Sequence, residues 1–238
     1  MERRQFIRIC AGSCTAVSLG LGESALAAAD AKPRHYSRAM LVDESGKPLR
    51  ASALQPGENY VFHYPFEGTP CFLLNLGRPT VRDVTLKTGS GEAYRWPGGV
   101  GKQRAIVAYS AICSHQLTHP TRQISFISYR EQSTASAISR PRMIHCCSEH
   151  SEFDPAAGAK VMGGPAPQPL CAILLEHREA DDSLHATGTM GGEMFDTFFR
   201  KFEMRLSLEH GGNRARNTTG DTTRVSRLSA YCKQQVRC

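Results

Sequence analysis

The residue types best suited to binding a metal occur in two short motifs. The first, YSAICSHQLTHP, contains Cys113 and His115 in a C-x-H spacing. The second, IHCCSEHSEFD, contains Cys147 and His150 in a C-x-x-H spacing. Two thiolates and two imidazoles make four ligands. That set suits either a tetrahedral zinc ion or a [2Fe–2S] cluster in which two histidines replace two cysteines on one iron.

Taken together, the two motifs resemble those of the Rieske iron–sulfur proteins. C-x-H in one loop and C-x-x-H in the next is the signature of that family, and Phe153-Asp154 after the second histidine also fits it. The stretch GPAP, Gly164 to Pro167, resembles the proline-containing loop that covers the cluster in the subfamily of cytochrome bc complexes and arsenite oxidase small subunits. The resemblance covers residues 109–188 well, and the flanking segments in general character.

The resemblance implies one [2Fe–2S] cluster per chain, with two cysteines on one iron and two histidines on the other. These cofactor-binding and metal-binding residues are Cys113, Cys147, His115 and His150. Using Cys146 in place of Cys147 would give C-x-x-x-H, which departs from the motif. Two further histidines, His119 and His145, are expected to be surface or hydrogen-bonding residues and not ligands.

The ligand set determines the redox chemistry that such a cluster would have. Two ferric ions, two sulfides and two thiolates sum to zero charge, whereas four thiolates would leave a charge of about −2. An electron is added more easily to a neutral cluster, so the potential lies above that of all-cysteine ferredoxins. Reduction also raises the pKa of the histidine ligands, so that one electron can travel with a proton.

The sequence departs from the cytochrome bc type at positions that tune the cluster. In that type each cluster loop has an extra cysteine, and the two form a disulfide; here Thr118 and Glu149 stand at the corresponding positions. Phe153 stands where a tyrosine often donates a hydrogen bond to a ligand sulfur. Because fewer hydrogen bonds to sulfur stabilise the reduced cluster less, we expect a potential in the lower or middle part of the Rieske range of roughly −150 to +300 mV.

The resemblance implies an exported electron-transfer protein, a subunit or partner of a respiratory oxidoreductase rather than a stand-alone catalyst. The sequence contains no nucleotide-binding fingerprint, nucleophile elbow or c-type haem motif. The redox partner would be a cytochrome, a quinol-oxidising membrane subunit or a molybdenum enzyme. A zinc-binding structural or interaction domain with the same four ligands is the alternative. A Rieske oxygenase component is disfavoured, because the chain is too short for an additional catalytic iron domain.

Residues 1–29 have the three parts of an export signal. Arg3 and Arg4 precede a mild apolar run over residues 9–21, and Ala25-Leu26-Ala27 is a suitable cleavage site. The paired arginines resemble a twin-arginine signal, whose pathway exports folded proteins. The apolar run is shorter than the roughly 20 residues of a membrane span, although an uncleaved signal would still anchor the chain. We therefore expect the protein in the periplasm or at the periplasmic face of the inner membrane.

Charge and cysteine content describe the rest of the chain. The formal charge is +7, from 29 Lys/Arg and 22 Asp/Glu, and the segment 211–238 holds six of these bases and one Asp. The remainder is nearly balanced, which argues against nucleic-acid binding. Because the segment 211–238 lacks an apolar period, we predict a flexible basic tail, in which Cys232 and Cys238 pair or stay free.

Strand patterns dominate residues 37–210, the predicted Rieske domain with cluster-binding loops at 109–120 and 144–170. Residues 80–96 read as a hairpin around Gly-Ser-Gly, residues 104–112 as a buried strand, and residues 170–188 as a second hairpin. Phenylalanines at i, i+3, i+4 and i+7 predict a short helix over 193–202, and alternating apolar residues predict a strand over 202–208. The expected fold is all-β, a Rieske-type antiparallel β sandwich with a small cluster-binding subdomain and a short C-terminal helix.

The paired arginines give the first testable prediction. Replacing Arg3→Lys together with Arg4→Lys should block export, because the twin-arginine pathway reads the arginine pair itself. Cell fractionation followed by immunoblotting measures the effect. Normal periplasmic accumulation of the double variant would show that the signal belongs to another pathway.

Overall fold

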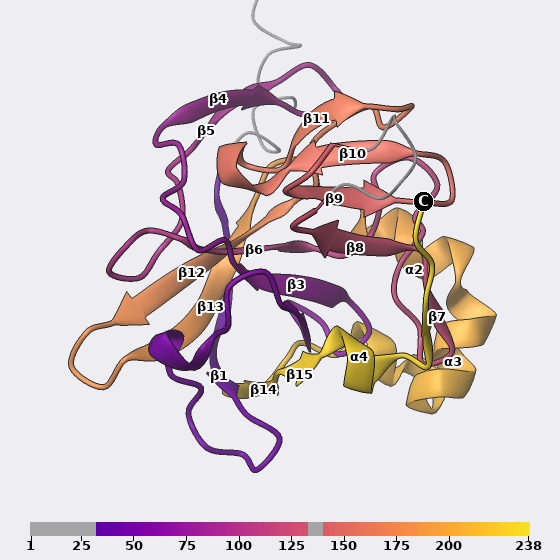
Figure 1. Ribbon diagram of the computed structural model, residues 1–238. Coiled ribbons are helices and arrows are strands. Elements are labelled where there is room, and N and C mark those ends of the chain that lie inside the picture. Colours follow the sequence, from indigo (N-terminus) through magenta and orange to yellow (C-terminus); the bar gives the residue numbers. More distant parts are fainter. Residues whose placement is uncertain (1–31, 133–139) are drawn as a thin grey trace, which may run out of the picture.

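Strands make up most of the computed structural model, which describes residues 32–132 and 140–238 (Figure 1). They are β1 (Arg34–Val42), β2 (Asn59–His63), β3 (Pro70–Asn75), β4 (Val84–Lys87), β5 (Ala93–Trp96), β6 (Ile106–Ser110), β7 (Ile124–Ser125), β8 (Ile127–Arg130), β9 (Met143–Cys146), β10 (Ser151–Asp154), β11 (Lys160–Gly163), β12 (Ala172–Arg178), β13 (Ser183–Met190), β14 (Thr222–Arg224), β15 (Ser226–Arg227) and β16 (Gln234–Gln235). The helical elements are η1 (Ala51–Ala53), η2 (Pro155–Ala157), α2 (Phe195–Lys201), α3 (Glu203–His210), η3 (Gly212–Arg216) and α4 (Leu228–Tyr231). The prediction of an all-β fold with a short C-terminal helical part is confirmed.

Two sheets form the framework. An eight-stranded sheet has the order β14-β1-β13-β12-β6-β3-β2-β15, and a four-stranded sheet has the order β11-β10-β9-β8. Two further sheets have two strands each and pair β4 with β5 and β16 with β7. The eight-stranded sheet is called the large sheet below, and the four-stranded sheet the small sheet. The β4–β5 and β12–β13 hairpins were both predicted, because each needs only a local turn between two apolar segments.

The eight-stranded sheet buries both of its faces. Along β3, Phe72 and Leu74 belong to one core cluster, whereas Cys71 and Leu73 belong to the cluster on the opposite face. The predicted buried strand, β6, is buried at every position. The sheet also curls, since the Thr223 hydroxyl of β14 donates to a carbonyl of β2 at 2.9 Å. One core cluster therefore lies inside this curled sheet and the other outside it.

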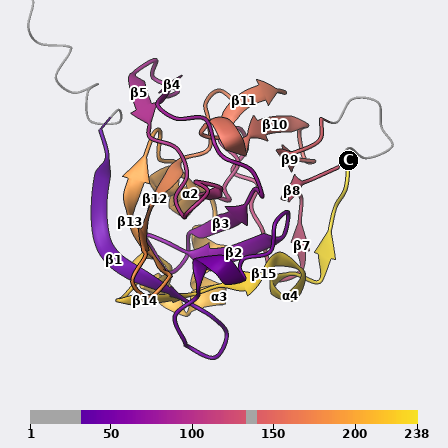
Figure 2. The same ribbon diagram turned by 60° about the vertical axis from the view of Figure 1, so that its left-hand side comes forward.

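The four-stranded sheet and the β4–β5 hairpin cover the outer cluster. Both views place them on the same side of β3 and β6 (Figures 1 and 2). The outer cluster contains buried side chains from each part: Tyr109 from β6, Ile127 from β8, Ile144 from β9, Phe153 from β10 and Trp96 from β5. This packing fixes the small sheet, and with it the loop between β9 and β10, against the large sheet.

The helical segment agrees with one prediction and corrects another. Helix α2 forms as predicted, with Phe195, Phe198 and Phe199 buried. The strand predicted over residues 202–208 is wrong, because these residues continue into α3. The alternating apolar residues do not share one buried face, since Leu206 is buried while Met204 and Leu208 are 80% and 81% exposed.

The flexible tail predicted for residues 211–238 differs from the structure, in which this segment runs through η3, β14, β15, α4 and β16. Four of its apolar residues, isolated in the sequence, are buried: Ala215, Val225, Leu228 and Cys232. Short elements that change direction every few residues leave no apolar period, which is why composition suggested a solvated tail. The segment supplies both edge strands of the eight-stranded sheet, β14 and β15, and then rises beside β7 (Figure 1).

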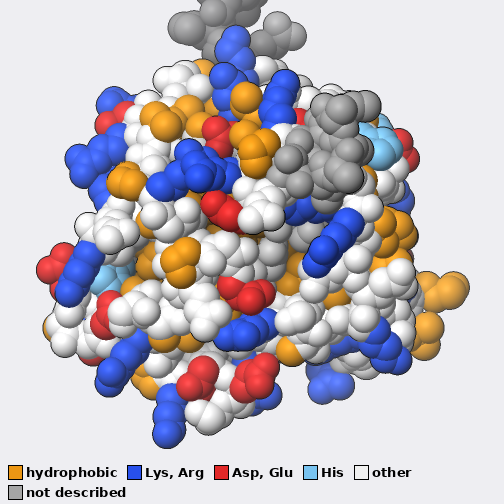
Figure 3. Space-filling model, viewed as in Figure 1, with side chains coloured by type: hydrophobic (Ala, Val, Ile, Leu, Met, Phe, Trp, Pro, Cys, Tyr) orange, Lys and Arg blue, Asp and Glu red, His pale blue; other side chains and the backbone are white. Residues whose placement is uncertain are grey.

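The face seen in Figure 3 carries Lys and Arg side chains at many separate points, with Asp and Glu between them. In the part of the chain that the structure describes, no helix is both long and apolar enough to cross a membrane. The predicted export signal at residues 1–29 lies outside the described residues.

The docking of α4 on β2 gives a prediction about pH. The Nε2 of His63 is hydrogen-bonded to the Tyr231 hydroxyl at 3.2 Å. Burial lowers the pKa of His63 to about 4, and the charges of His210 and Arg122 add to this shift. A lowered pKa means that the unfolded chain binds the proton more tightly. The contribution of neutral His63 to the free energy of unfolding is therefore complete above pH 6.5, the ordinary pKa of histidine. It is lost as the pH falls towards 4.

Replacing His63→Gln should flatten the fall in unfolding free energy between pH 6.5 and 4 by on the order of 2 kcal/mol. Urea unfolding at several pH values measures it. His35→Gln, at an exposed histidine, serves as the control and should follow the wild type. Equal slopes for His63→Gln and wild type would contradict the prediction.

Candidate metal centre

The first motif forms a tight loop at the end of β6. The Cys113 N–H donates to the Thr118 carbonyl at 2.8 Å, and the Leu117 N–H donates back to the Cys113 carbonyl at 2.9 Å. Leu117 adopts a left-handed backbone with φ of 61°. The loop buries Cys113, which is 1% exposed, while His115 remains partly exposed. We call residues 113–118 loop 1.

The second motif connects β9 to β10 at the edge of the small sheet. Cys146 ends β9, where it pairs with Ser151 of β10 on one side and with Ile127 of β8 on the other. Residues 147–150, here called loop 2, make the turn, and His150 ends it with a left-handed φ of 55°. Cys146 is fully buried, whereas His150 is exposed.

The two loops meet through a pair of thiols. Cys113 and Cys146 belong to the same buried core cluster, the two thiols are close enough to interact electrostatically, and both are free. That contact, supported by N–H groups of loop 1, lowers the pKa of Cys113 to about 7. The same contact and desolvation raise the pKa of Cys146. The surroundings therefore favour the thiolate at Cys113 and oppose it at Cys146.

Two polar atoms beside this pair are buried and have no close hydrogen-bond partner among the described residues: the Nδ1 of His115 and the hydroxyl of Ser151. The Ser151 hydroxyl also lies near enough to the Cys113 sulfur to favour its thiolate. Buried polar groups in proteins are normally paired. A group bound at this position could satisfy both atoms.

The proline-containing segment contacts loop 2 at one end and loop 1 at the other. A Cβ at Gly164 would lie 2.4 Å from the His150 carbonyl oxygen and 2.6 Å from the Ser151 Cα, so only glycine fits there. At the other end of the segment, the Ser114 hydroxyl of loop 1 donates to the Gln168 carbonyl at 2.7 Å. Three segments from different parts of the chain thus meet at one site.

The structure does not bring all four predicted ligands together. Cys147 forms a disulfide with Cys238, with the Cα atoms 5.5 Å apart. Across the described ranges, no group of three or more His, Cys, Asp or Glu is arranged to hold a metal ion. The buried thiols and the unpartnered His115 nitrogen suit a cluster, but the set that includes Cys147 does not fit while that sulfur is bonded. The ligand assignment stays a prediction.

Sequence reasoning missed the residues that surround Cys147. The Arg130 guanidinium donates to the Cys147 sulfur at 2.7 Å, to the Val236 carbonyl at 2.9 Å and to the Cys238 carbonyl at 2.5 Å. The one sequence signal for this arrangement is Cys238, for which the sequence predicts either a disulfide or a free thiol. Ser151 was missed because a serine after a histidine carries no distinctive spacing.

The spare histidines lie away from the thiol pair. His119 is buried between Phe198 and Phe202, with ring centroids 4.8 Å from each, and its Nδ1 is 2.9 Å from the Leu117 carbonyl oxygen. The Nε2 of His145 lies 2.7 Å from the Arg140 carbonyl oxygen. Both have roles in packing and hydrogen bonding, in keeping with what the sequence led us to expect.

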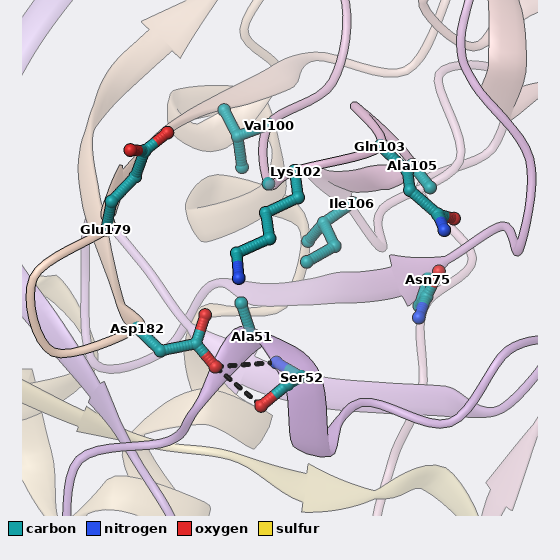
Figure 4. A pocket seen from close by; sticks show the side chains of 11 residues that line it. Ala51, Ser52, Asn75, Val100, Lys102, Gln103, Ala105, Ile106, Glu179 and Asp182 are labelled. Atoms are coloured by element: carbon teal, nitrogen blue, oxygen red, sulfur yellow. Dashed lines mark hydrogen bonds between the residues drawn. The ribbon is translucent and has the colours of Figure 1, made fainter.

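A separate pocket of about 410 Å³ lies at the opposite end of β6 from loop 1 (Figure 4). In it the Asp182 carboxylate accepts hydrogen bonds from the N–H and hydroxyl of Ser52 at 3.0 and 2.6 Å, and lies 2.8 Å from the Nε2 of His177. The Ser52 bonds lower the pKa of Asp182 to about 2. Because the serine proton points at the carboxylate rather than at the imidazole, this trio is not arranged as a nucleophile and its base.

Comparison with known proteins gives the following findings. No protein-family model matches the chain. The structure is similar to the crystal structure of the soluble domain of the Rieske protein II (soxF) from Sulfolobus acidocaldarius, with a TM-score of 0.44 and 23% sequence identity. The similarity covers 66% of this chain and 82% of that chain. A likeness of this size does not establish the family of the chain, so its function depends on its own residues.

Gly164 provides a test of the three-segment contact. Replacing Gly164→Ala should destabilise the protein by about 1–3 kcal/mol more than Gly46→Ala, because the added methyl group meets backbone atoms. Gly46 is the matched control, since it has a similar φ, 81° against 79°, but open space around it. Urea unfolding of both variants measures the difference. Equal losses would show that the proline-containing segment is not held against loop 2.

Proposed function

We propose that the chain is an exported Rieske-type [2Fe–2S] electron-transfer protein, a subunit or partner of a respiratory oxidoreductase. The observation that carries the proposal is the meeting of the two motif loops. Two buried thiols, Cys113 and Cys146, face each other there, and the unpartnered Nδ1 of His115 and hydroxyl of Ser151 lie beside them. A bound group at this place accounts for all four atoms, and the motif spacing indicates which group it is.

The arrangement of the site suits a carrier that meets its partner at the surface. A [2Fe–2S] cluster, when bound, supplies the exchange of one electron. The cysteines of the two loops lie inside the protein, whereas His115 is partly exposed and His150 is exposed. A partner that docks at the loop tips would therefore contact the histidine side of the site, while the protein core excludes water from the sulfur side.

The partner and compartment are part of the proposal. The twin-arginine resemblance at Arg3 and Arg4 favours the periplasm, or the periplasmic face of the inner membrane if the signal is not cleaved. The partner classes that fit are a cytochrome, a quinol-oxidising membrane subunit and a molybdenum enzyme. In such a system the partner performs the catalysis and this chain transfers electrons.

Metal analysis of the purified full chain tests the proposal. We expect about two irons and two acid-labile sulfides per chain, visible absorption that bleaches on reduction, and an electron paramagnetic resonance signal in the reduced state only. A redox titration should give a midpoint in the lower or middle part of the range of roughly −150 to +300 mV. One zinc per chain in a colourless, redox-silent protein would overturn the proposal in favour of a structural zinc domain.

A further inference from the structure

We propose that Cys146, and not Cys147, supplies the second thiolate of the metal centre, and that the Cys147–Cys238 disulfide is a clamp that holds residues 232–238 against loop 2. The inference rests on the proposed function and names the ligands of that same site. It reverses the assignment expected from the motif spacing. It also gives loop 2 a covalent support in place of the disulfide between the two loops that is missing at Thr118 and Glu149.

The pleat of β9 decides which cysteine faces loop 1. Neighbouring residues of a strand point to opposite faces. Ile144 and Cys146, two positions apart, both belong to the core cluster that also contains Cys113. Cys147 is the next residue and its sulfur is bonded away from that core, to Cys238. Only one of two adjacent cysteines can face Cys113, and it is Cys146.

The two cysteines also occupy comparable places at the ends of strands. Cys113 follows the last residue of β6 by three positions and is 1% exposed, and Cys146 is the last residue of β9 and has no exposed area. Ser151, which pairs with Cys146 across β9 and β10, has a buried hydroxyl with no hydrogen-bond partner among the described residues. Cys146 therefore lies beside an unsatisfied polar atom at the place where the two loops meet.

Cys147 is built into a different arrangement. Its N–H donates to the Phe126 carbonyl at 2.7 Å, and its sulfur, besides the bond to Cys238, accepts from the buried Arg130. Arg130 also holds two carbonyls of the segment 232–238, and that segment pairs with β7 through β16. Within the described ranges this is the single disulfide, and both the Arg130 hydrogen bonds and the pairing of β16 with β7 hold residues 232–238 beside it.

The ligand set that follows keeps both histidines. Cys113 and His115 retain the C-x-H spacing of loop 1, and Cys146 with His150 makes C-x-x-x-H in loop 2. His150 ends the turn directly before β10 with a left-handed backbone and completes the proposed set. The extra residue is Cys147, whose side chain leaves the site for the clamp.

Disulfide mapping on the cluster-loaded wild-type protein is the first test. The full chain is purified with its iron, unfolded in the presence of an alkylating agent, digested and analysed by mass spectrometry. We expect Cys147 and Cys238 joined in one peptide pair, and Cys113 and Cys146 both alkylated, because ligand thiolates are released on unfolding. Recovery of Cys147 as an alkylated thiol from iron-loaded protein would overturn the inference.

Three variants of the full chain give the second test. Cys146→Ser should lower the iron and sulfide content at least about tenfold. Cys147→Ser and Cys238→Ser should both keep the cluster signal, and both should show faster hydrogen exchange in residues 232–238 than the wild type. Cys238→Ser is the matched control, since it opens the disulfide without changing loop 2.

The outcomes separate this inference from the proposed function. Loss of the cluster in Cys147→Ser with retention in Cys238→Ser would show that Cys147 is a ligand, and would overturn the inference while leaving the function intact. A wild-type chain without iron would instead overturn the function. If Cys146→Ser fails to fold, as judged by circular dichroism, the comparison of Cys147→Ser with Cys238→Ser and the mapping still decide the question.

Discussion

The contact between the eight-stranded and four-stranded sheets is the constraint on which the candidate metal centre depends. Loop 1 leaves the large sheet and loop 2 joins two strands of the small one, so the core between the sheets sets the position of one loop relative to the other. Tyr109 lies at its centre with no exposed area, and its hydroxyl donates to the Pro155 carbonyl at 2.7 Å. A buried hydroxyl that lost this partner would cost about 1–3 kcal/mol. The hydrogen bond therefore specifies how the sheets align, in addition to the apolar burial that holds them together.

Burial alone would work against a thiolate at this centre. Cys71 and Cys171 are buried in the same protein, and desolvation raises the pKa of both thiols. Cys113 is equally buried, but its pKa is lowered to about 7 because the thiol of Cys146 and the N–H groups of its own loop stabilise the charge. The difference between these cysteines is their hydrogen-bonding environment and not their depth. The loops thus convert one core cysteine into a group suited to binding a metal.

The sequence was informative wherever structure is local. The β4–β5 and β12–β13 hairpins, the buried strand β6 and the helix α2 each follow from apolar spacing and turn residues within about 20 positions. The two motif loops were located for the same reason. Residues 202–208 were misread because alternating apolar residues predict a strand only if they share a buried face, and Met204 and Leu208 are exposed on α3.

The choice between Cys146 and Cys147 could not be made from spacing, because it depends on the pleat of β9. That pleat is set by pairing with β8 and β10, in which Cys146 lies opposite Ile127 and Ser151. A shift of one residue in this register would exchange the two cysteines. The fold of residues 211–238 was inaccessible for a related reason: Val225, Leu228 and Cys232 pack in core clusters with residues of strands far away in the chain.

The end of the described chain is therefore a structural part of the candidate site. The Cys147–Cys238 disulfide joins positions 91 residues apart, and closing a loop of that size removes on the order of 4 kcal/mol of conformational freedom from the unfolded state. Loop 1 is held separately, since the Lys201 ammonium of α2 donates to the Gln116 carbonyl at 2.9 Å and Ser114 is bonded to the proline-containing segment. Each ligand-bearing loop thus has its own support in addition to the shared core. Under the proposed function such support would matter, because ligands held rigidly need little rearrangement when the charge of the bound group changes.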